Sequence, residues 1–164
     1  MADEGTTGPN PDHGPSVMIV DDDAEMRALL RDALERDGFS VREHASGDEL
    51  VPVLECGAPD AIVLDKEMAG TNGLDLLSYI RRRHPGTSVI LVTAFGGSEV
   101  EAEALKLGAA YYMDKPFRVA RLLQVLRAAV SQAARRGGAP VGRVWMVDAN
   151  RAEARESDNH SSSR

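Results

Sequence analysis

Asp60-Ala-Ile-Val-Leu-Asp65-Lys-Glu-Met-Ala-Gly-Thr-Asn72-Gly73 is the stretch around which the chain is organised. Four apolar residues lead directly into Asp65, and a polar loop with two glycines follows. A continuous apolar run is typical of a parallel strand buried on both faces, and open α/β sheets bind ligands outside the carboxyl ends of their strands. The pattern therefore predicts a buried strand that delivers Asp65 to a binding loop. The alternative is that Asp65 caps a helix, but Thr71 or Asn72 stands closer to the helical segment that begins at Gly73.

Outward from this stretch, apolar runs predict four more strands, and apolar residues at helical spacing predict a helix after each strand. The strands are expected at residues 16–20, 39–43, 88–93 and 110–114, and the helices at about 26–37, 47–55, 74–84, 98–107 and 119–135. We expect the 39–43 strand at a sheet edge, because polar residues flank Val41. We also expect Pro52 to bend or shorten the helix at about 47–55. Strand and helix patterns alternate five times. This alternation predicts an α/β fold, a doubly wound parallel sheet of five strands with five helices on its two faces.

Composition limits the number of domains and the classes of partner. A chain of 164 residues has room for one domain plus tails. We expect residues 1–15 to be a disordered lead, residues 16–136 to be the domain, and residues 137–164 to be a flexible tail. Within the tail, Val144-Trp-Met-Val-Asp148 resembles Val17-Met-Ile-Val-Asp21, which indicates the stump of a second domain, a docking segment or coincidence.

The charge and the apolar pattern exclude several classes. A net charge of -7, with 26 acidic and 19 basic side chains, argues against direct nucleic-acid binding. One cysteine, Cys56, leaves no internal disulfide, and no 18-residue apolar span is present. We therefore expect a soluble, cytoplasmic protein without a membrane segment. The four histidines are scattered, and we expect them on the solvated surface: His13, His44, His84 and His160.

Polar side chains follow four of the predicted strands at the same edge of the sheet. They are Asp21 and Asp22 after the first strand, Asp65, Thr93, and Lys115 just after the last strand. Converging carboxylates raise one another's pKa unless a cation offsets their charge, and Mg²⁺ prefers oxygen ligands. A carboxylate nucleophile beside a metal, a lysine and a hydroxyl suits phosphoryl transfer.

As a set, these motifs resemble those of bacterial two-component response-regulator receiver domains, over residues 16–136. The likeness rests on four motifs: Val20-Asp21-Asp22-Asp23, Asp65 with Met68 and Gly73, Val92-Thr93-Ala94, and Lys115-Pro116-Phe117. It implies a flavodoxin-like fold with strand order 2-1-3-4-5. The stretches Val92–Gly96 and Glu103–Ala109 look most like the receivers of enhancer-binding activators.

The resemblance also implies roles for individual residues. Asp65 would accept a phosphoryl group from a sensor histidine kinase or phosphotransfer protein, giving a 4-aspartylphosphate. Asp22, Asp65 and the backbone carbonyl of Glu67 would ligate Mg²⁺, with Asp21 acting through water. Lys115 and Thr93 would contact the phosphoryl oxygens, and Tyr112 would switch with Thr93. Lys115-Pro116 would be a cis peptide.

The implied output is a protein contact, made by a stand-alone phosphoacceptor and not by a metabolic enzyme. An unknown downstream protein would bind the surface of the fourth helix, fifth strand and fifth helix, and the same surface could form a homodimer. Ala69 departs from the family's usual proline.

Three alternatives come from other classes of protein. A haloacid-dehalogenase phosphatase needs a second aspartate where Glu67 stands, and an FMN binder needs a hydroxyl- and glycine-rich loop where the chain has Asp21-Asp22-Asp23. The remaining alternative is a phosphorylation-silent interaction module.

Overall fold

The run that ends in Asp65 forms β3 (Ala61–Asp65), the central strand of a five-stranded parallel sheet. The protein is seen here in a computed structural model, which describes residues 14–135. The sheet order is β2-β1-β3-β6-β7, which confirms the predicted order 2-1-3-4-5 and places β2 at an edge. The other strands of this sheet are β1 (Ser16–Val20), β2 (Ser40–His44), β6 (Ser88–Thr93) and β7 (Tyr111–Asp114).

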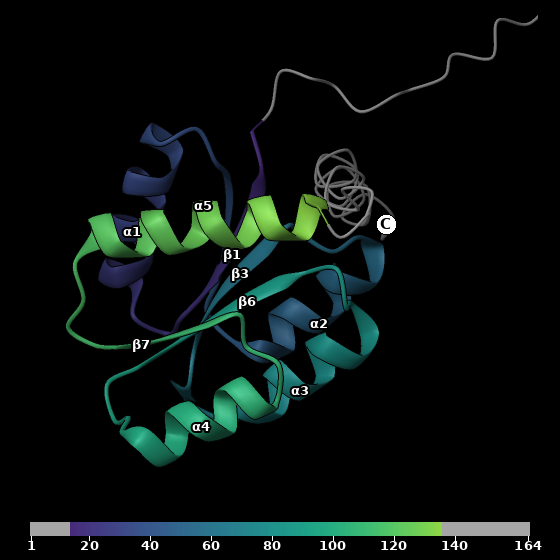
Figure 1. The fold of residues 1–164 in the computed structure, drawn as a ribbon, viewed down its shortest axis with the longest axis vertical. Helices are drawn as coiled ribbons and strands as arrows, with labels where there is room; N and C mark the ends of the chain where they lie inside the picture. Colours follow the sequence, from purple (N-terminus) through teal and green to yellow (C-terminus); the bar gives the residue numbers. More distant parts are fainter. Residues whose placement is uncertain (1–13, 136–164) are drawn as a thin grey trace, which may run out of the picture.

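Five helices cover the two faces of the sheet, as predicted (Figure 1). Helices α1 and α5 lie on one face, and α2, α3 and α4 lie on the other. Their bounds are α1 (Ala24–Arg36), α2 (Gly47–Cys56), α3 (Gly73–Arg83), α4 (Ser98–Lys106) and α5 (Val119–Arg135).

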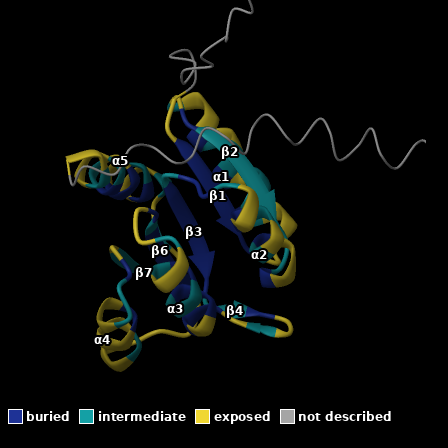
Figure 2. Ribbon diagram, turned by 90° about the vertical axis from the view of Figure 1, so that its right-hand side faces the viewer, coloured by how far each residue is buried: buried dark blue, intermediate teal, exposed yellow. Residues whose placement is uncertain are grey.

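Alternation along the strands divides the core into two clusters. Successive side chains of a strand point to opposite faces. In β3, Ile62 and Leu64 pack with α2 and α3, whereas Ala61 and Val63 pack with α1 and α5. Figure 2 shows β1 and β3 as buried strands, whereas β2 is only half buried. Burial on both faces explains why the central strands read as unbroken apolar runs.

The two aspartates of the central stretch have different tasks. Asp60, at the start of β3, accepts hydrogen bonds from the backbone N–H and the hydroxyl of Ser16, at 2.8 and 2.9 Å. This contact joins the starts of β3 and β1. It leaves Asp65, at the opposite end of the strand, as the carboxylate that the loops surround.

The backbone elements differ from the sequence prediction in three places. A short antiparallel hairpin, β4 (Glu67–Met68) and β5 (Thr71–Asn72), stands in the loop after Asp65 and was not predicted. Helix α2 continues through Pro52 to Cys56, so the proline does not shorten it. Pro15, assigned to the disordered lead, accepts a hydrogen bond from the Ser40 N–H at 2.9 Å, which extends the β1–β2 pairing.

The rest of the predicted lead and the 137–164 tail, with its Val144–Asp148 motif, lie outside the described residues. None of the helices in residues 14–135 is long and apolar enough to cross a membrane.

Candidate functional site

Asp65 ends β3 with its side chain almost fully enclosed, at 4% exposure. The backbone turns away immediately after it, and the Lys66 N–H donates to the Val92 carbonyl at 2.9 Å. Helix α3 returns so closely that a Cβ on Gly73 would lie 2.5 Å from the Lys66 Cα and 2.6 Å from the Asp65 carbonyl oxygen. Asn72 caps α3 by accepting from the Leu74 N–H, so Asp65 is not the helix cap. The loop is therefore fixed on both sides of Asp65.

Three carboxylates meet at this end of the sheet. Asp21, Asp22 and Asp65 each offer an oxygen, and these oxygens all lie within 4.8 Å of one another. Asp21 is 2% exposed, whereas Asp22 points to solvent. The Lys115 ammonium reaches in from the end of β7, with Nζ 2.8 Å from Asp21 Oδ2 and 3.6 Å from Asp65 Oδ1. The structure thus brings together the four predicted charged residues, and the Lys115-Pro116 bond is cis, as the resemblance implied.

Burial and neighbouring charge shift the ionisation of this cluster. Burial, together with the charge of Asp21, raises the pKa of Asp65 to about 6, although Lys115 opposes the shift. Burial would lower the pKa of Lys115, but its hydrogen bond to Asp21 and the two carboxylate charges raise it above its ordinary value. One ammonium group therefore does not fully compensate the acidic cluster.

The donor set fits a hard divalent cation. Three carboxylates offer only oxygen ligands, their oxygens are close enough to share one ion, and one of them faces solvent. Mg²⁺ is held in proteins by one or two carboxylates and keeps several waters, which matches a site that is open on the Asp22 side. The raised pKa of Asp65 is the expected sign of a site that lacks positive charge.

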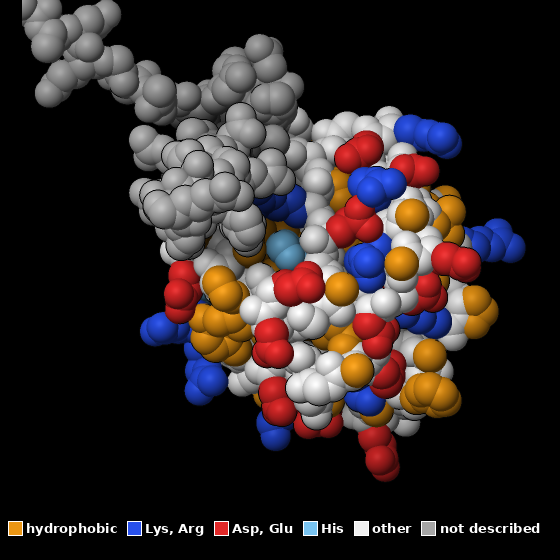
Figure 3. All heavy atoms as spheres, turned by 180° about the vertical axis from the view of Figure 1, so that it is seen from behind, with side chains coloured by type: hydrophobic (Ala, Val, Ile, Leu, Met, Phe, Trp, Pro, Cys, Tyr) orange, Lys and Arg blue, Asp and Glu red, His pale blue; other side chains and the backbone are white. Residues whose placement is uncertain are grey.

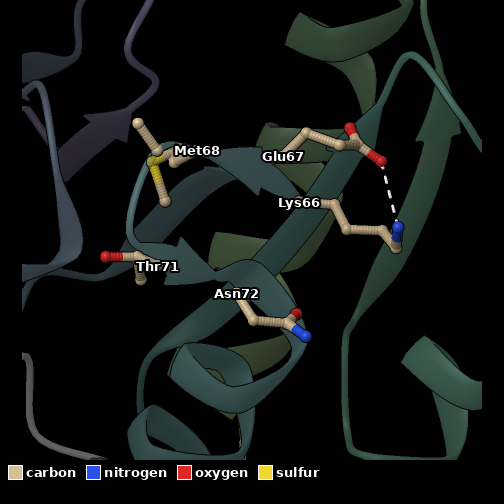
Figure 4. Close-up of a pocket in the computed structure, with 6 residues that line it drawn as sticks. Lys66, Glu67, Met68, Thr71 and Asn72 are labelled. Carbon is tan, nitrogen blue, oxygen red and sulfur yellow. Dashed lines mark hydrogen bonds and ion pairs between the residues drawn. The ribbon is translucent and has the colours of Figure 1, made fainter.

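Thr93, at the end of β6, lies next to this cluster and is completely buried. Its hydroxyl donates to Glu67 Oε1 at 2.5 Å and accepts from the Phe95 N–H at 3.1 Å. Glu67 also pairs with Lys66, and Figure 4 shows both side chains extending to the same side of the β4–β5 hairpin. An open hollow of about 580 Å³ adjoins the hairpin; it is lined by Lys66, Glu67, Met68, Ala69, Thr71 and Asn72.

Tyr112, on β7, is held through its hydroxyl group, which donates to Asp114 Oδ1 at 2.7 Å and accepts from the Gly97 N–H at 3.1 Å. Gly96 lies against both Tyr112 and Thr93, because a Cβ there would lie 1.8 Å from the Tyr112 oxygen and 3.1 Å from Thr93 Cγ2. The loop between β6 and α4 is therefore held by both side chains.

Sequence reasoning singled out Glu67 but missed the contact of its side chain with Thr93. The Glu67 carboxylate accepts a hydrogen bond from the Thr93 hydroxyl. The sequence signal for this role was the presence of an acidic side chain two residues after the buried Asp65. Arg27 was also missed; it donates to the Asp21 carbonyl at 2.6 Å.

The expectation that His44 lies on the solvated surface is wrong. Its side chain is 12% exposed, and Nε2 is buried without a hydrogen-bond partner among the described residues. Burial lowers the pKa of His44, an effect that Glu49 opposes. The histidine ends the edge strand, where α2 covers the sheet, and its carbonyl accepts from the Asp21 N–H.

Comparison with known proteins gives a family match over most of the chain. The model of the response regulator receiver domain matches residues 17–127. The chain is 36% identical over 124 residues to the transcriptional regulatory protein FixJ of Azorhizobium caulinodans, covering 74% of this chain and 57% of FixJ. It is 36% identical over 113 residues to the DNA-binding transcriptional regulator NtrC of Klebsiella pneumoniae, covering 69% of this chain and 24% of NtrC. The chain thus spans about half or less of the length of such relatives.

Solved structures of single receiver domains match over nearly their whole length. A CheY-like response regulator receiver domain protein from Methanospirillum hungatei superposes with a TM-score of 0.72 at 25% identity, covering 75% of this chain and 98% of that one. The receiver domain of the Francisella response regulator 1452 superposes with a TM-score of 0.69 at 27% identity, covering 73% of this chain and 98% of that one.

Proposed function

The chain belongs to the response regulator receiver family, and we propose that it is a phosphoacceptor in which Asp65 takes a phosphoryl group from a histidine kinase or phosphotransfer protein. The observation that carries the proposal is the enclosure of Asp65 beside two further carboxylates and the Lys115 ammonium. Buried carboxylates without full compensation are costly for stability. A reaction that requires these carboxylates best explains why the site contains them despite their cost to stability.

In the proposed reaction, an Asp65 carboxylate oxygen attacks the phosphorus of a phosphohistidine. The phosphorus–nitrogen bond breaks, and the imidazole nitrogen keeps its electron pair and takes a proton from solvent. Lys115 is within reach of the new phosphoryl oxygens, since its Nζ lies 3.6 Å from Asp65 Oδ1. When Mg²⁺ is bound, Asp21, Asp22, Asp65 and the Glu67 carbonyl would hold it, and it would offset the charge of the transferring group.

The proposed output is a change at the surface of α4, β7 and α5. Thr93 and Tyr112 both hold the loop that precedes α4, so a new partner for the Thr93 hydroxyl would alter that loop and the Tyr112 ring. Phe95 and Leu105, just before and on α4, are 76% and 47% exposed and offer apolar area to a partner. A downstream protein or a second copy of the chain would bind there, which makes the chain a signalling module.

Intact-mass measurement after treatment with phosphoramidate tests the proposal. We expect one added phosphoryl group on the parent in millimolar Mg²⁺, none in EDTA, and none on Asp65→Asn. Asp32→Asn, which changes an exposed aspartate on α1, is the matched control and should be labelled like the parent. An adduct that persists in Asp65→Asn would contradict the assignment of the acceptor, and a parent that takes no phosphoryl group would leave a phosphorylation-silent interaction module.

A further inference from the structure

The Glu67 carboxylate bridges the hairpin after β3 and the end of β6. One oxygen accepts from the Thr93 hydroxyl at 2.5 Å and from the Lys66 ammonium at 3.0 Å. The other oxygen accepts from the Ala94 backbone N–H at 3.3 Å. A hydroxyl, a backbone amide and an ammonium therefore converge on one anionic group, as donors do in an anion-binding site.

These donors stand where a phosphoryl group on Asp65 would need them. Strands β3 and β6 are paired with Asp65 opposite Val92, so Thr93 and Ala94 come directly after the residue that faces the acceptor. On the hairpin that follows β3, the Glu67 N–H donates to Asp65 Oδ1 at 3.4 Å. The Glu67 backbone therefore lies beside Asp65, and its carboxylate reaches the hydrogen-bond donors Thr93 and Ala94 at the end of β6.

We propose that the Glu67 carboxylate is an internal stand-in for the phosphoryl group, occupying the Thr93 hydroxyl and the Ala94 amide until Asp65 is phosphorylated. The proposal rests on the phosphoacceptor function and adds a restraint on the switch. A hydroxyl has one proton to donate, so Thr93 cannot bond a phosphoryl oxygen while it bonds Glu67. The unphosphorylated form is thereby favoured by the Glu67–Thr93 contact, and phosphorylation must displace it.

The surroundings of Glu67 agree with this role. Its carboxylate accepts from the Lys66 ammonium at 3.0 Å as well as from the Thr93 hydroxyl at 2.5 Å, and hydrogen bonds that involve charged groups are stronger than neutral ones. The Glu67 side chain is 31% exposed beside the hollow at the hairpin, which leaves it room to swing away (Figure 4).

The same contact reaches the surface that the proposed function assigns to output. The Thr93 hydroxyl accepts from the Phe95 N–H, and two residues later the Gly97 N–H donates to the Tyr112 hydroxyl. Moving Thr93 away from Glu67 changes the first of these loop contacts. Glu67 is thus a positioning residue, which acts on the switch through Thr93.

Two measurements on Glu67→Ala test the proposal. In the unphosphorylated, metal-free protein, NMR should show that the Thr93 hydroxyl proton exchanges with solvent about tenfold faster or more, because a hydrogen bond to a charged group has been removed. With phosphoramidate and Mg²⁺, labelling of Asp65 should be about tenfold faster than in the parent. Glu55→Ala, an exposed glutamate on α2, is the matched control and should change neither rate.

A cycle with Thr93→Val separates the hydrogen bond from simple charge repulsion. If Glu67 acts through Thr93, Glu67→Ala should accelerate labelling much less in the Thr93→Val background than in the parent. Equal acceleration in both backgrounds, or an unchanged Thr93 hydroxyl exchange rate, overturns the proposal while leaving the phosphoacceptor intact. Absence of any adduct in the parent instead removes the proposed function, and the stand-in role with it.

Discussion

Replacing the acceptor by its amide should stabilise the metal-free protein. Asp65 is buried beside Asp21, and its pKa is raised from 3.8 to about 6. A carboxyl group whose pKa is higher in the folded state than in the unfolded state binds its proton more tightly when folded. Its ionisation therefore opposes folding at neutral pH. Asp65→Asn removes this charge while keeping the size of the side chain.

The pKa difference sets the magnitude and the pH range of the effect. Raising the pKa from 3.8 to about 6 corresponds to about 3 kcal/mol at pH 7.5, where Asp65 is ionised in both states. The new amide N–H₂ must find an acceptor in the buried site, so we expect a net gain of about 1 to 3 kcal/mol. The extra stability of Asp65→Asn should be fully present above the pKa of Asp65 in the folded protein. It should shrink as the pH falls through 6 and vanish below 3.8.

Urea unfolding in EDTA, followed by far-UV circular dichroism between pH 4 and pH 8, measures this difference. Asp32→Asn is the control and should change the free energy of unfolding by less than about 0.5 kcal/mol at every pH. Millimolar Mg²⁺ should stabilise the parent more than Asp65→Asn, because the variant has lost one ligand. The reasoning is refuted if Asp65→Asn is no more stable than the parent at pH 7.5, or if its advantage does not shrink towards pH 4.

Three further substitutions test the packing around the site. Gly73→Ala places a Cβ 2.5 Å from the Lys66 Cα and should lower the free energy of unfolding in urea by about 1 to 3 kcal/mol. Gly86→Ala, which has open space around it, is the control and should lower it little. Equal losses in the two variants would contradict the close approach of α3 to the loop after Asp65. Lys115→Met leaves the buried carboxylates of Asp21 and Asp65 without their cation, so the free energy of unfolding should fall by about 1 to 3 kcal/mol at pH 7.5 in EDTA. Millimolar Mg²⁺ should restore most of this loss; if it does not, the lysine does not act by balancing the carboxylate charge. Gly96→Ala places a Cβ 1.8 Å from the Tyr112 hydroxyl oxygen and 2.0 Å from Asp114 Oδ1, which are hydrogen-bonded to each other, so it should cost about 1 to 3 kcal/mol in urea unfolding and shift the NMR signals of the Tyr112 ring; unchanged stability with unshifted signals would refute the contact.

The fold and the charged residues of the site were predictable because they depend on strong local patterns. Strands buried on both faces must be apolar throughout, so β1, β3 and β6 stood out; Asp21 follows β1 directly, and β3 and β6 end in Asp65 and Thr93. Parallel strands end at one edge, which is why Asp21, Asp65 and Lys115 could be placed together before the structure was known.

The contacts of flexible side chains were not predictable in the same way. The β4–β5 hairpin pairs only Glu67–Met68 with Thr71–Asn72, too few residues for a periodic pattern. Nothing local in the sequence says that Glu67 turns towards β6, since that contact depends on the pairing of β3 with β6. His44 was misjudged because its burial comes from helix α2 packing on an edge strand with polar neighbours.

The charge of the cluster explains why metal and phosphoryl group should be linked in this domain. Asp21, Asp22 and Asp65 surround a single ammonium group, that of the half-buried Lys115, so the site is already short of positive charge. A phosphoryl group carries a charge of about -1.5 to -2 at pH 7, more than the carboxylate charge that it replaces on Asp65. Phosphorylation therefore deepens the deficit where burial weakens screening by solvent, and the two positive charges of one divalent cation more than offset the negative charge that the phosphoryl group adds. On this argument the phosphorylated form should bind Mg²⁺ more tightly than the unphosphorylated form, and removal of the metal should shift the equilibrium of phosphoryl transfer away from phosphorylated Asp65.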